Sequence, residues 1–204
     1  MGSTELIRRR MMGSIKPYDA EVKWLSSNGT AFIDTGIVPK DTPRVVINLM
    51  ALNANIDVDV CGFASNTVPS FIGDFTIFND RKQSFAYFRY YSTARVGQSL
   101  ASSVEYNDWA EWDLGYIIKC NNVTLETLTR QSFASNSQTL YLFKGRNIAH
   151  ANIRVGKVKI YDGDKLKRDF IPVRVGQVGY MYDKVSGQLF GNVNTDNFII
   201  GNDI

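Results

Sequence analysis

Short runs in which apolar and polar residues alternate recur along the chain, and clusters of Gly, Asn, Asp and Ser separate them. This period of two is typical of half-buried β-strands, and the helical period of 3.6 is almost missing after the first dozen residues. The sequence therefore predicts an all-β, two-sheet antiparallel sandwich. The expected strands are Val22–Leu25, Phe32–Asp34, Arg44–Ala51, Val58–Ala64, Phe71–Phe78, Ser84–Tyr91, Glu111–Lys119, Thr139–Lys144, Ile153–Tyr161, Lys165–Val173, Val178–Asp183 and Gln188–Phe190.

The clearest hairpin is expected in the segment VKIYDGDKLKRDF. Asp162-Gly163 supplies the positive φ angles that a tight primed turn needs. Because the runs on both sides alternate, Val158, Ile160 and, across the turn, Leu166 are expected to face the core.

Two further turns are predicted. Residues 184–187 are expected to turn with Gly187 in the left-handed conformation, and Asn79-Asp80-Arg81-Lys82 is expected to be a polar turn between two aromatic strands. Neither an internal repeat nor a linker interrupts residues 21–204, so we expect them to form one domain, preceded by an arm of residues 1–20.

The composition of the chain argues against several classes of function. With 204 residues, 44% of them hydrophobic, the chain can bury one sizeable core. The formal net charge is +3 and much of the excess lies in Arg8, Arg9 and Arg10, so the body is close to neutral and nucleic-acid binding is not expected. No apolar run is long enough for a membrane span, and the N-terminal segment does not read as a secretory signal. Synthesis in a cytoplasm is expected.

The first twenty residues differ from the rest. Thr4 can cap a short helix, but its apolar residues are too few for an independent core. We expect an arm that docks on a partner chain, and the alternative is a frayed tail or a cloning remnant. The residues predicted to contact the partner are Leu6, Ile7, Arg8, Arg9, Arg10, Met11 and Met12.

Two blocks carry a family resemblance: WLSSNGTAFIDTGIVP near the start, and KVKIYDGDKLKRDFIPVRVGQVGYMYDKVSGQLFGNVNTDNFIIG near the end. They resemble the opening and closing strands of concanavalin A-like, LamG-like jelly-roll domains, which are common in structural proteins of gut bacteriophages and in surface proteins of their bacterial hosts. The segment TELIRRRMM also resembles leader arms of such phage proteins. The middle of the chain is compatible with the resemblance without being diagnostic.

The resemblance implies a jelly roll that begins at Ile33-Asp34-Thr35-Gly36. Phe170-Ile171-Pro172-Val173 would lie on a core strand, and Tyr182-Asp183 with Ser186-Gly187 would form the last hairpin. In such a fold the first and last strands are neighbours and protect each other's edges. Pro172 removes one ladder donor, which favours an edge position or a bulge. The residues expected to fill space in this closing segment are Phe170, Ile171, Val173, Val178, Tyr180 and Phe190.

The segment VEYNDWAEWDLG is the best candidate for enzyme-like chemistry, because Glu111 and Asp113 would share one strand face with Trp109. Sandwich glycosidases use paired carboxylates, but here Glu105, Asp108 and Glu111 are spaced by threes, which scatters them over both faces. No catalytic residue is therefore predicted. The simpler interpretation is that both acids are solvated, while Trp109 and Trp112 anchor opposite faces of an inner strand.

Other reactive residues do not cluster. The lone His150 has no recognisable partner, so neither a metal centre nor a cofactor is predicted. The sequence leaves open whether Cys61 and Cys120 lie close together. It also leaves open whether Asp57 and Asp59 bind calcium.

Aromatic residues concentrate in SFAYFRYY. In an extended chain one side of this segment must face the core, and the other side carries aromatic rings. These rings are suited to stacking on sugars or to a subunit contact. Packing of the rings under a loop is the alternative explanation of the same residues. The residues predicted for glycan or subunit contact are Tyr87, Arg89, Tyr91 and Trp109.

These patterns predict a non-enzymatic bacteriophage virion protein, such as a capsid decoration, head fibre or tail component. It would dock on other virion proteins through its arm, form homo-oligomers and display a lectin-like sandwich that could adhere to bacterial surface glycans. The alternative is a carbohydrate-binding module of a bacterial surface protein. A glycoside hydrolase would need two carboxylates about 5 to 9.5 Å apart in a cleft.

Overall fold

A computed structural model describes residues 16–27, 31–52, 60–65, 75–80, 85–90, 94–96, 107–134, 136–144 and 153–204. These residues form strands and loops, and no helix occurs among them. The strands are β1 (Ala20–Glu21), β2 (Leu25–Ser26), β3 (Ile33–Asp34), β4 (Pro43–Ala51), β5 (Val60–Ser65), β6 (Phe75–Asp80), β7 (Phe85–Tyr90), β8 (Ala94–Val96), β9 (Trp109–Leu114), β10 (Ile117–Cys120), β11 (Val123–Thr127), β12 (Tyr141–Leu142), β13 (Ile153–Asp162), β14 (Lys165–Val175), β15 (Val178–Asp183), β16 (Gln188–Phe190) and β17 (Ile199–Ile200).

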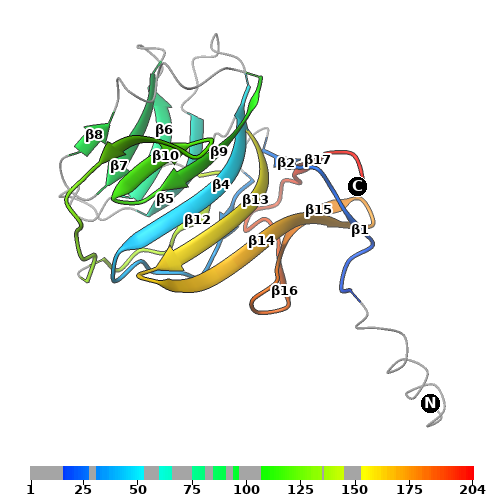
Figure 1. Cartoon of the computed structure of the whole chain (residues 1–204). Helices are drawn as coiled ribbons and strands as arrows, with labels where there is room; N and C mark the ends of the chain where they lie inside the picture. The colour runs from blue at the N-terminus through cyan, green and yellow to red at the C-terminus, as the bar shows by residue number, and fades with distance from the viewer. Residues whose placement is uncertain are drawn as a thin grey trace.

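The strands form two antiparallel sheets (Figure 1). The large sheet has the order β11-β10-β9-β4-β13-β14-β15-β16, with β1 paired to β14 and β2 paired to both β13 and β17. The small sheet has the order β3-β12-β5-β6-β7-β8. The predicted all-β, two-sheet antiparallel sandwich is therefore confirmed.

The core lies between the two sheets and follows the alternation seen in the sequence. Along β4, Val45, Ile47 and Leu49 are buried, whereas the residues between them are exposed or half-buried. Trp112 of β9 is among the largest fully buried side chains. β4, β9 and β13 therefore each have an inner apolar face and a more polar outer face, whereas residues 170–173 of β14 are buried on both faces.

The last strand is a neighbour of the second, β2, whereas β3, where the resemblance placed the start of the jelly roll, pairs with β12 in the small sheet. β2 pairs with β17 through Leu25 and Ile200, and an isolated bridge joins Val22 to Asp203. In Figure 1 the C-terminus accordingly lies beside β1. The two chain ends close the same region of the large sheet.

The hairpin of β13 and β14 forms with a shifted turn. Asp162 still belongs to β13, and the turn residues are Gly163, with φ of 59°, and Asp164. One positive φ at the first turn position is typical of a type II′ turn. The prediction for Leu166 was wrong: it is 38% exposed because it lies opposite Tyr161, on the outer face.

Other expectations also need correction. Asn79 and Asp80, expected in a polar turn, belong to β6 and pair with Ala86 and Phe85 of β7. The run 111–119 is not one strand, because the chain turns back at Gly115 and Tyr116 between β9 and β10. Val178 does not fill the core; it is 37% exposed beside the turn that joins β14 to β15.

Pro172 lies on an inner strand rather than an edge. On one side of β14, pairing with β13 ends at Phe170 and pairing with β1 begins at Val173. Pro172 therefore lies between the part of β14 that pairs with β13 and the part that pairs with β1, where no ladder hydrogen bond from its nitrogen is needed.

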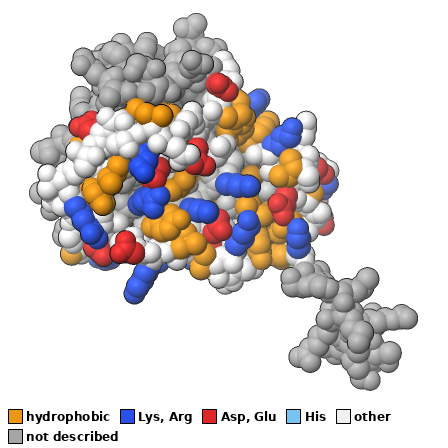
Figure 2. Space-filling model, in the orientation of Figure 1, with side chains coloured by type: hydrophobic (Ala, Val, Ile, Leu, Met, Phe, Trp, Pro, Cys, Tyr) orange, Lys and Arg blue, Asp and Glu red, His pale blue; other side chains and the backbone are white. Residues whose placement is uncertain are grey.

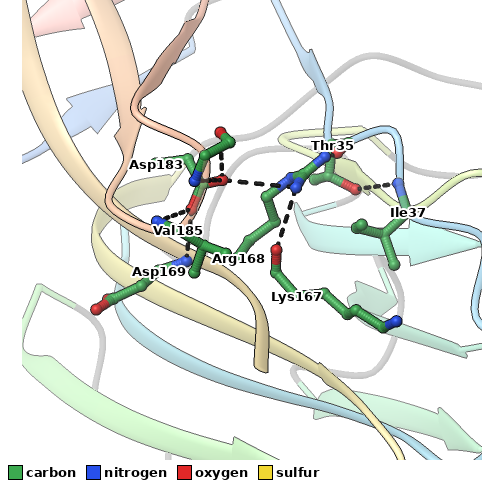
Figure 3. Close-up of polar contacts among 8 residues, drawn as sticks. Thr35, Ile37, Lys167, Arg168, Asp169, Asp183 and Val185 are labelled. Atoms are coloured by element: carbon green, nitrogen blue, oxygen red, sulfur yellow. Dashed lines mark hydrogen bonds and ion pairs between the residues drawn. The ribbon is translucent and has the colours of Figure 1, made fainter. Parts of the chain in front are cut away.

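The last hairpin is confirmed, and a buried carboxylate organises it (Figure 3). Gly187 has φ of 72°, and Asp183 is completely buried. The Asp183 carboxylate accepts hydrogen bonds from the backbone N–H groups of Asp169, Val185 and Ser186 and from the Ser186 hydroxyl. These bonds compensate the cost of burying the charge and fix the turn.

Arg168 links this hairpin to the small sheet. Its Nη1 lies 3.5 Å from Oδ2 of Asp183, and its Nε donates to the carbonyl of Thr35, just after β3 (Figure 3). Because Arg168 lies opposite Ile160, its side chain is on the inner face of the large sheet. One arginine therefore ties the β15–β16 turn to the start of the sandwich.

Candidate binding groove on the large sheet

The outer face of the large sheet carries polar and aromatic side chains at alternate positions of three adjacent strands. β4 contributes Arg44, Val46 and Asn48 to this face. In Figure 2, Lys and Arg side chains are spread over the visible face, with acidic and apolar side chains between them. The other contributors are Glu111 and Asp113 from β9, and Lys157, Lys159 and Tyr161 from β13.

This face holds two hollows. One has a volume of about 550 Å³ and the other of about 320 Å³, and Arg44 and Tyr161 line both. Volumes of this size are within the range of small-ligand sites. We call them together the outer-face groove, lined by Lys23, Thr42, Arg44, Val46, Asn48, Glu111, Asp113, Gly115, Tyr116, Ile117, Lys119, Arg130, Gly156, Lys157, Lys159, Tyr161, Gly163 and Asp164.

Arg44 is held between an acid and a ring at the junction of the two hollows. Its Nε and Nη2 lie 2.6 and 2.7 Å from Oδ1 and Oδ2 of Asp113. Its guanidinium carbon lies 4.9 Å from the ring centroid of Tyr161. The hydrogen bonds to Asp113 raise the pKa of Arg44 above its ordinary value. A two-pronged ion pair of this kind fixes both side chains in one orientation.

The bulge in β13 shapes the floor of the larger hollow. Val155 pairs with Leu49 and Val158 with Ile47, so two residues of β13 lie opposite Asn48. One of them is Gly156, where an added Cβ would lie 3.1 Å from Oδ1 of Asn48. The absence of a side chain at Gly156 leaves room for the Asn48 amide over the β13 backbone.

The two acids of the enzyme-like segment share this outer face, as predicted. Glu111 is exposed and lines the larger hollow, whereas Asp113 lines the smaller one and is engaged by Arg44. The Trp prediction is also confirmed: Trp112 is buried in the core, and Trp109 is half-buried on the outer face, where it lies opposite Met50.

The aromatic strand predicted for contacts lies in the other sheet. Tyr87 and Arg89 belong to β7 of the small sheet, whereas Trp109 belongs to β9 of the large sheet. The side chains of Tyr87 and Arg89 and all of Tyr91 are outside the description. Tyr90 is buried, and its hydroxyl donates to the carbonyl of Gln131.

Several predicted residues lie outside the described ranges. They are the arm residues Leu6, Ile7, Arg8, Arg9, Arg10, Met11 and Met12, together with His150, Asp57 and Asp59. The side chain of Cys61 is also outside them, while Cys120 is buried in β10. Among the described residues, no three His, Cys, Asp or Glu side chains gather as metal ligands would. Nor does that part of the chain contain a helix with the length and apolarity for crossing a bilayer.

The sequence did not predict the groove, although its signal is visible afterwards. The signal is a set of polar and aromatic residues at the outward positions of neighbouring strands. Here these residues are Arg44, Asn48, Lys159 and Tyr161. Recognising this requires the pairing of β4 with β13, which are about a hundred residues apart in sequence. Alternation identifies which face of each strand is outward but not which strands are neighbours.

The comparisons with known proteins concern the fold. No protein-family model matches the chain, and no curated protein matches its sequence. A crystal structure of a candidate carbohydrate-binding protein from Bacteroides ovatus matches with a TM-score of 0.56 and 10% sequence identity. The match covers 88% of this chain and 60% of the other, so the chain spans less than two thirds of that protein's length. At this identity the likeness establishes a shared β-sandwich fold.

Proposed function

We propose that the chain is a carbohydrate-binding β-sandwich and that it holds a glycan in the outer-face groove. The observation that carries the proposal is the aromatic and hydrogen-bonding set around Arg44 and Tyr161, on an open sheet face between two hollows. Sugar recognition uses this combination, because apolar ring faces stack on aromatic rings and hydroxyls bond to planar polar groups. The structural neighbour is itself a candidate carbohydrate-binding protein, which supports the same class of ligand.

We infer that the groove binds rather than cleaves its glycan. Two residues along a strand span about 6.6 Å, so Glu111 and Asp113 meet the spacing that glycosidases require. Asp113, however, has both carboxylate oxygens engaged by Arg44, and Glu111 is exposed to solvent. Because Asp113 is held by Arg44, this pair does not offer the two free carboxylates that cleavage of a glycosidic bond needs.

Affinity electrophoresis in gels containing bacterial polysaccharides tests the binding proposal. Tyr161→Ala should raise the Kd about tenfold and so reduce the retardation, because it removes both the stacking ring and the contact that positions Arg44. Tyr180→Ala is the matched control, since Tyr180 is also half-buried but does not line the groove. Equal losses in both variants, or no retardation of the wild type by any polysaccharide, would contradict the proposal. Release of reducing sugar by the wild type, abolished in Glu111→Gln, would contradict the inference of binding without cleavage.

The finer proposal is that this sandwich is a bacteriophage virion component assembled in the bacterial cytoplasm. It rests on the LamG-like opening and closing blocks and on the phage-like arm of residues 1–20. In this proposal the arm binds another virion protein, homo-oligomers multiply weak glycan contacts, and the part from Tyr87 to Tyr91 contributes a subunit contact.

Particle incorporation tests the virion role. Tyr18 already packs on the sandwich, with its ring centroid 5.1 Å from that of Tyr182, and Asp19 accepts from the N–H of Gly176. Deletion of residues 1–15 therefore preserves these contacts and removes the part of the arm that precedes them. The truncated chain should fold but fail to enter particles. Equal incorporation of both chains would overturn the docking role of the arm.

A further inference from the structure

The larger hollow of the outer-face groove carries an excess of positive charge. Lys23, Arg44, Lys157 and Lys159 line it, and Glu111 is its one lining acid. Asp113 neutralises Arg44 from the side of the smaller hollow. Among the described residues, none forms a hydrogen bond or ion pair with the side chains of the three lysines. The charge of these lysines is therefore available to a ligand.

The strand register gathers these charges. Lys157 and Lys159 are two residues apart on β13 and project from the same outer face, next to the bulge that includes Gly156. Lys23 reaches the same hollow from the segment between β1 and β2. The Asn48 amide lies over Gly156 and, within the described chain, has no hydrogen-bond partner. The hollow thus offers ammonium groups around a neutral donor and acceptor.

We propose that this hollow selects an acidic sugar, one that carries a carboxylate or sulfate group within a glycan chain. This inference rests on the proposed glycan binding and adds the ligand class. The anionic group lies among Lys23, Lys157 and Lys159, and Asn48 and Glu111 bind sugar hydroxyls. Ammonium groups bind carboxylate and sulfate as point charges, so both kinds of acidic sugar satisfy the site.

The pattern of charges on the same face favours an acidic glycan over a nucleic acid. Across the sheet, directly opposite positions read Lys119, Asp113, Val46, Lys159 and Asp169, so acids alternate with lysines. Duplex DNA presents one charge per about 1.7 Å of its axis and would meet these acids as well as the lysines. A polymer with fewer charges and many hydroxyls fits the alternation better.

Isothermal titration of the full chain tests the inference with four polymers: polygalacturonate, dextran sulfate, neutral dextran and single-stranded DNA. The wild type should bind at least one acidic polysaccharide more tightly than dextran, with an affinity that falls as salt rises. The double variant K157Q/K159Q should lose about fivefold or more in affinity for that polymer. Binding to polygalacturonate but not dextran sulfate, or the reverse, identifies the anionic group.

The matched control is K167Q/K184Q, which removes the same charge from positions outside the groove. It should keep the wild-type affinity, and thermal unfolding should show that both double variants fold. Equal losses in the two variants, equal affinity for dextran and the acidic polymers, or tighter binding of DNA would each overturn the acidic-sugar proposal. Binding of dextran alone would leave the proposed glycan binding intact, whereas failure of every polysaccharide would remove both.

Discussion

Arg44 of β4 and Asp113 of β9 form a two-pronged ion pair on the outer face of the large sheet, with N–O distances of 2.6 and 2.7 Å. The side chain of Arg44 is 46% exposed and that of Asp113 is 19% exposed. Solvent screens a pair of this kind, so it contributes little to stability. Its geometric effect is larger, because it holds the guanidinium over Tyr161 where the two hollows meet.

Arg44→Lys should therefore separate binding from stability. The lysine keeps the charge but loses the planar fork, so the free energy of unfolding should change by less than about 1 kcal/mol while glycan affinity falls. Urea unfolding and affinity electrophoresis measure the two effects. A loss of several kcal/mol with unchanged affinity would show that the pair is structural.

Asp183→Asn should destabilise the protein strongly. The buried carboxylate accepts four hydrogen bonds and faces Arg168, and an amide replaces one acceptor oxygen with a donor. Breaking a buried charge pair typically costs about 3 to 5 kcal/mol. Chemical denaturation measures the loss. Asp169→Asn is the control, because Asp169 contributes its backbone N–H to this cluster, and it should change the stability little.

Gly179→Ala should disturb the closure of the sandwich. An added Cβ at this position would lie 2.6 Å from Cδ2 of Leu25 and 3.3 Å from Cβ of Phe198. Both neighbours are buried, so we expect a loss of about 1 to 3 kcal/mol from overpacking, measured by thermal unfolding. Gly176→Asn is the control: Gly176 has φ of 58° with open space around it, and asparagine tolerates that conformation. Similar losses at both positions would refute the close-packing argument.

Glu21 should make the region of the chain ends sensitive to acid. Hydrogen bonds from Lys16 and Tyr18 lower the pKa of the Glu21 carboxyl below its ordinary value. A carboxyl whose pKa is lowered in the folded state stabilises the fold at pH values above its ordinary pKa. This contribution is lost as pH falls through the folded-state pKa.

The difference in Tm between wild type and Glu21→Gln should therefore be largest above about pH 4.5 and should shrink at lower pH. Glu126→Gln, on the far edge of the same sheet, controls for the loss of one surface charge. A Tm difference that persists unchanged into strong acid would be inconsistent with stabilisation by the ionised Glu21 carboxylate.

Long strands with regular alternation were the most predictable part of the fold. β4, β13 and β15 start and end within one residue of the expected positions, and the three-residue β16 was located by the turn predicted before it, at residues 184–187. The strands that the sequence did not predict, β1, β8, β11 and β17, have two to five residues, too few for a clear period. Their formation depends on pairing with a neighbour rather than on their own residues.

Errors of register arose at bulges and at turns. The shift between Ile160 and Tyr161 decides that Leu166 faces outward, and no local pattern reveals it. Gly115 was the missed signal between β9 and β10: an added Cβ there would lie 3.3 Å from Cβ of Arg44. The groove shares this difficulty, because its residues come from strands whose order only the folded sheet defines.

The bridge between Val22 and Asp203 has a mechanical consequence. Tension applied between residue 19 and residue 204 would load the hydrogen bonds of the terminal strands one after another, as in unzipping, instead of shearing them together. The longer ladder between β4 and β13, which supports Asn48 and Lys159, lies away from that line of force. The terminal strands would therefore separate while the β4–β13 ladder stays paired.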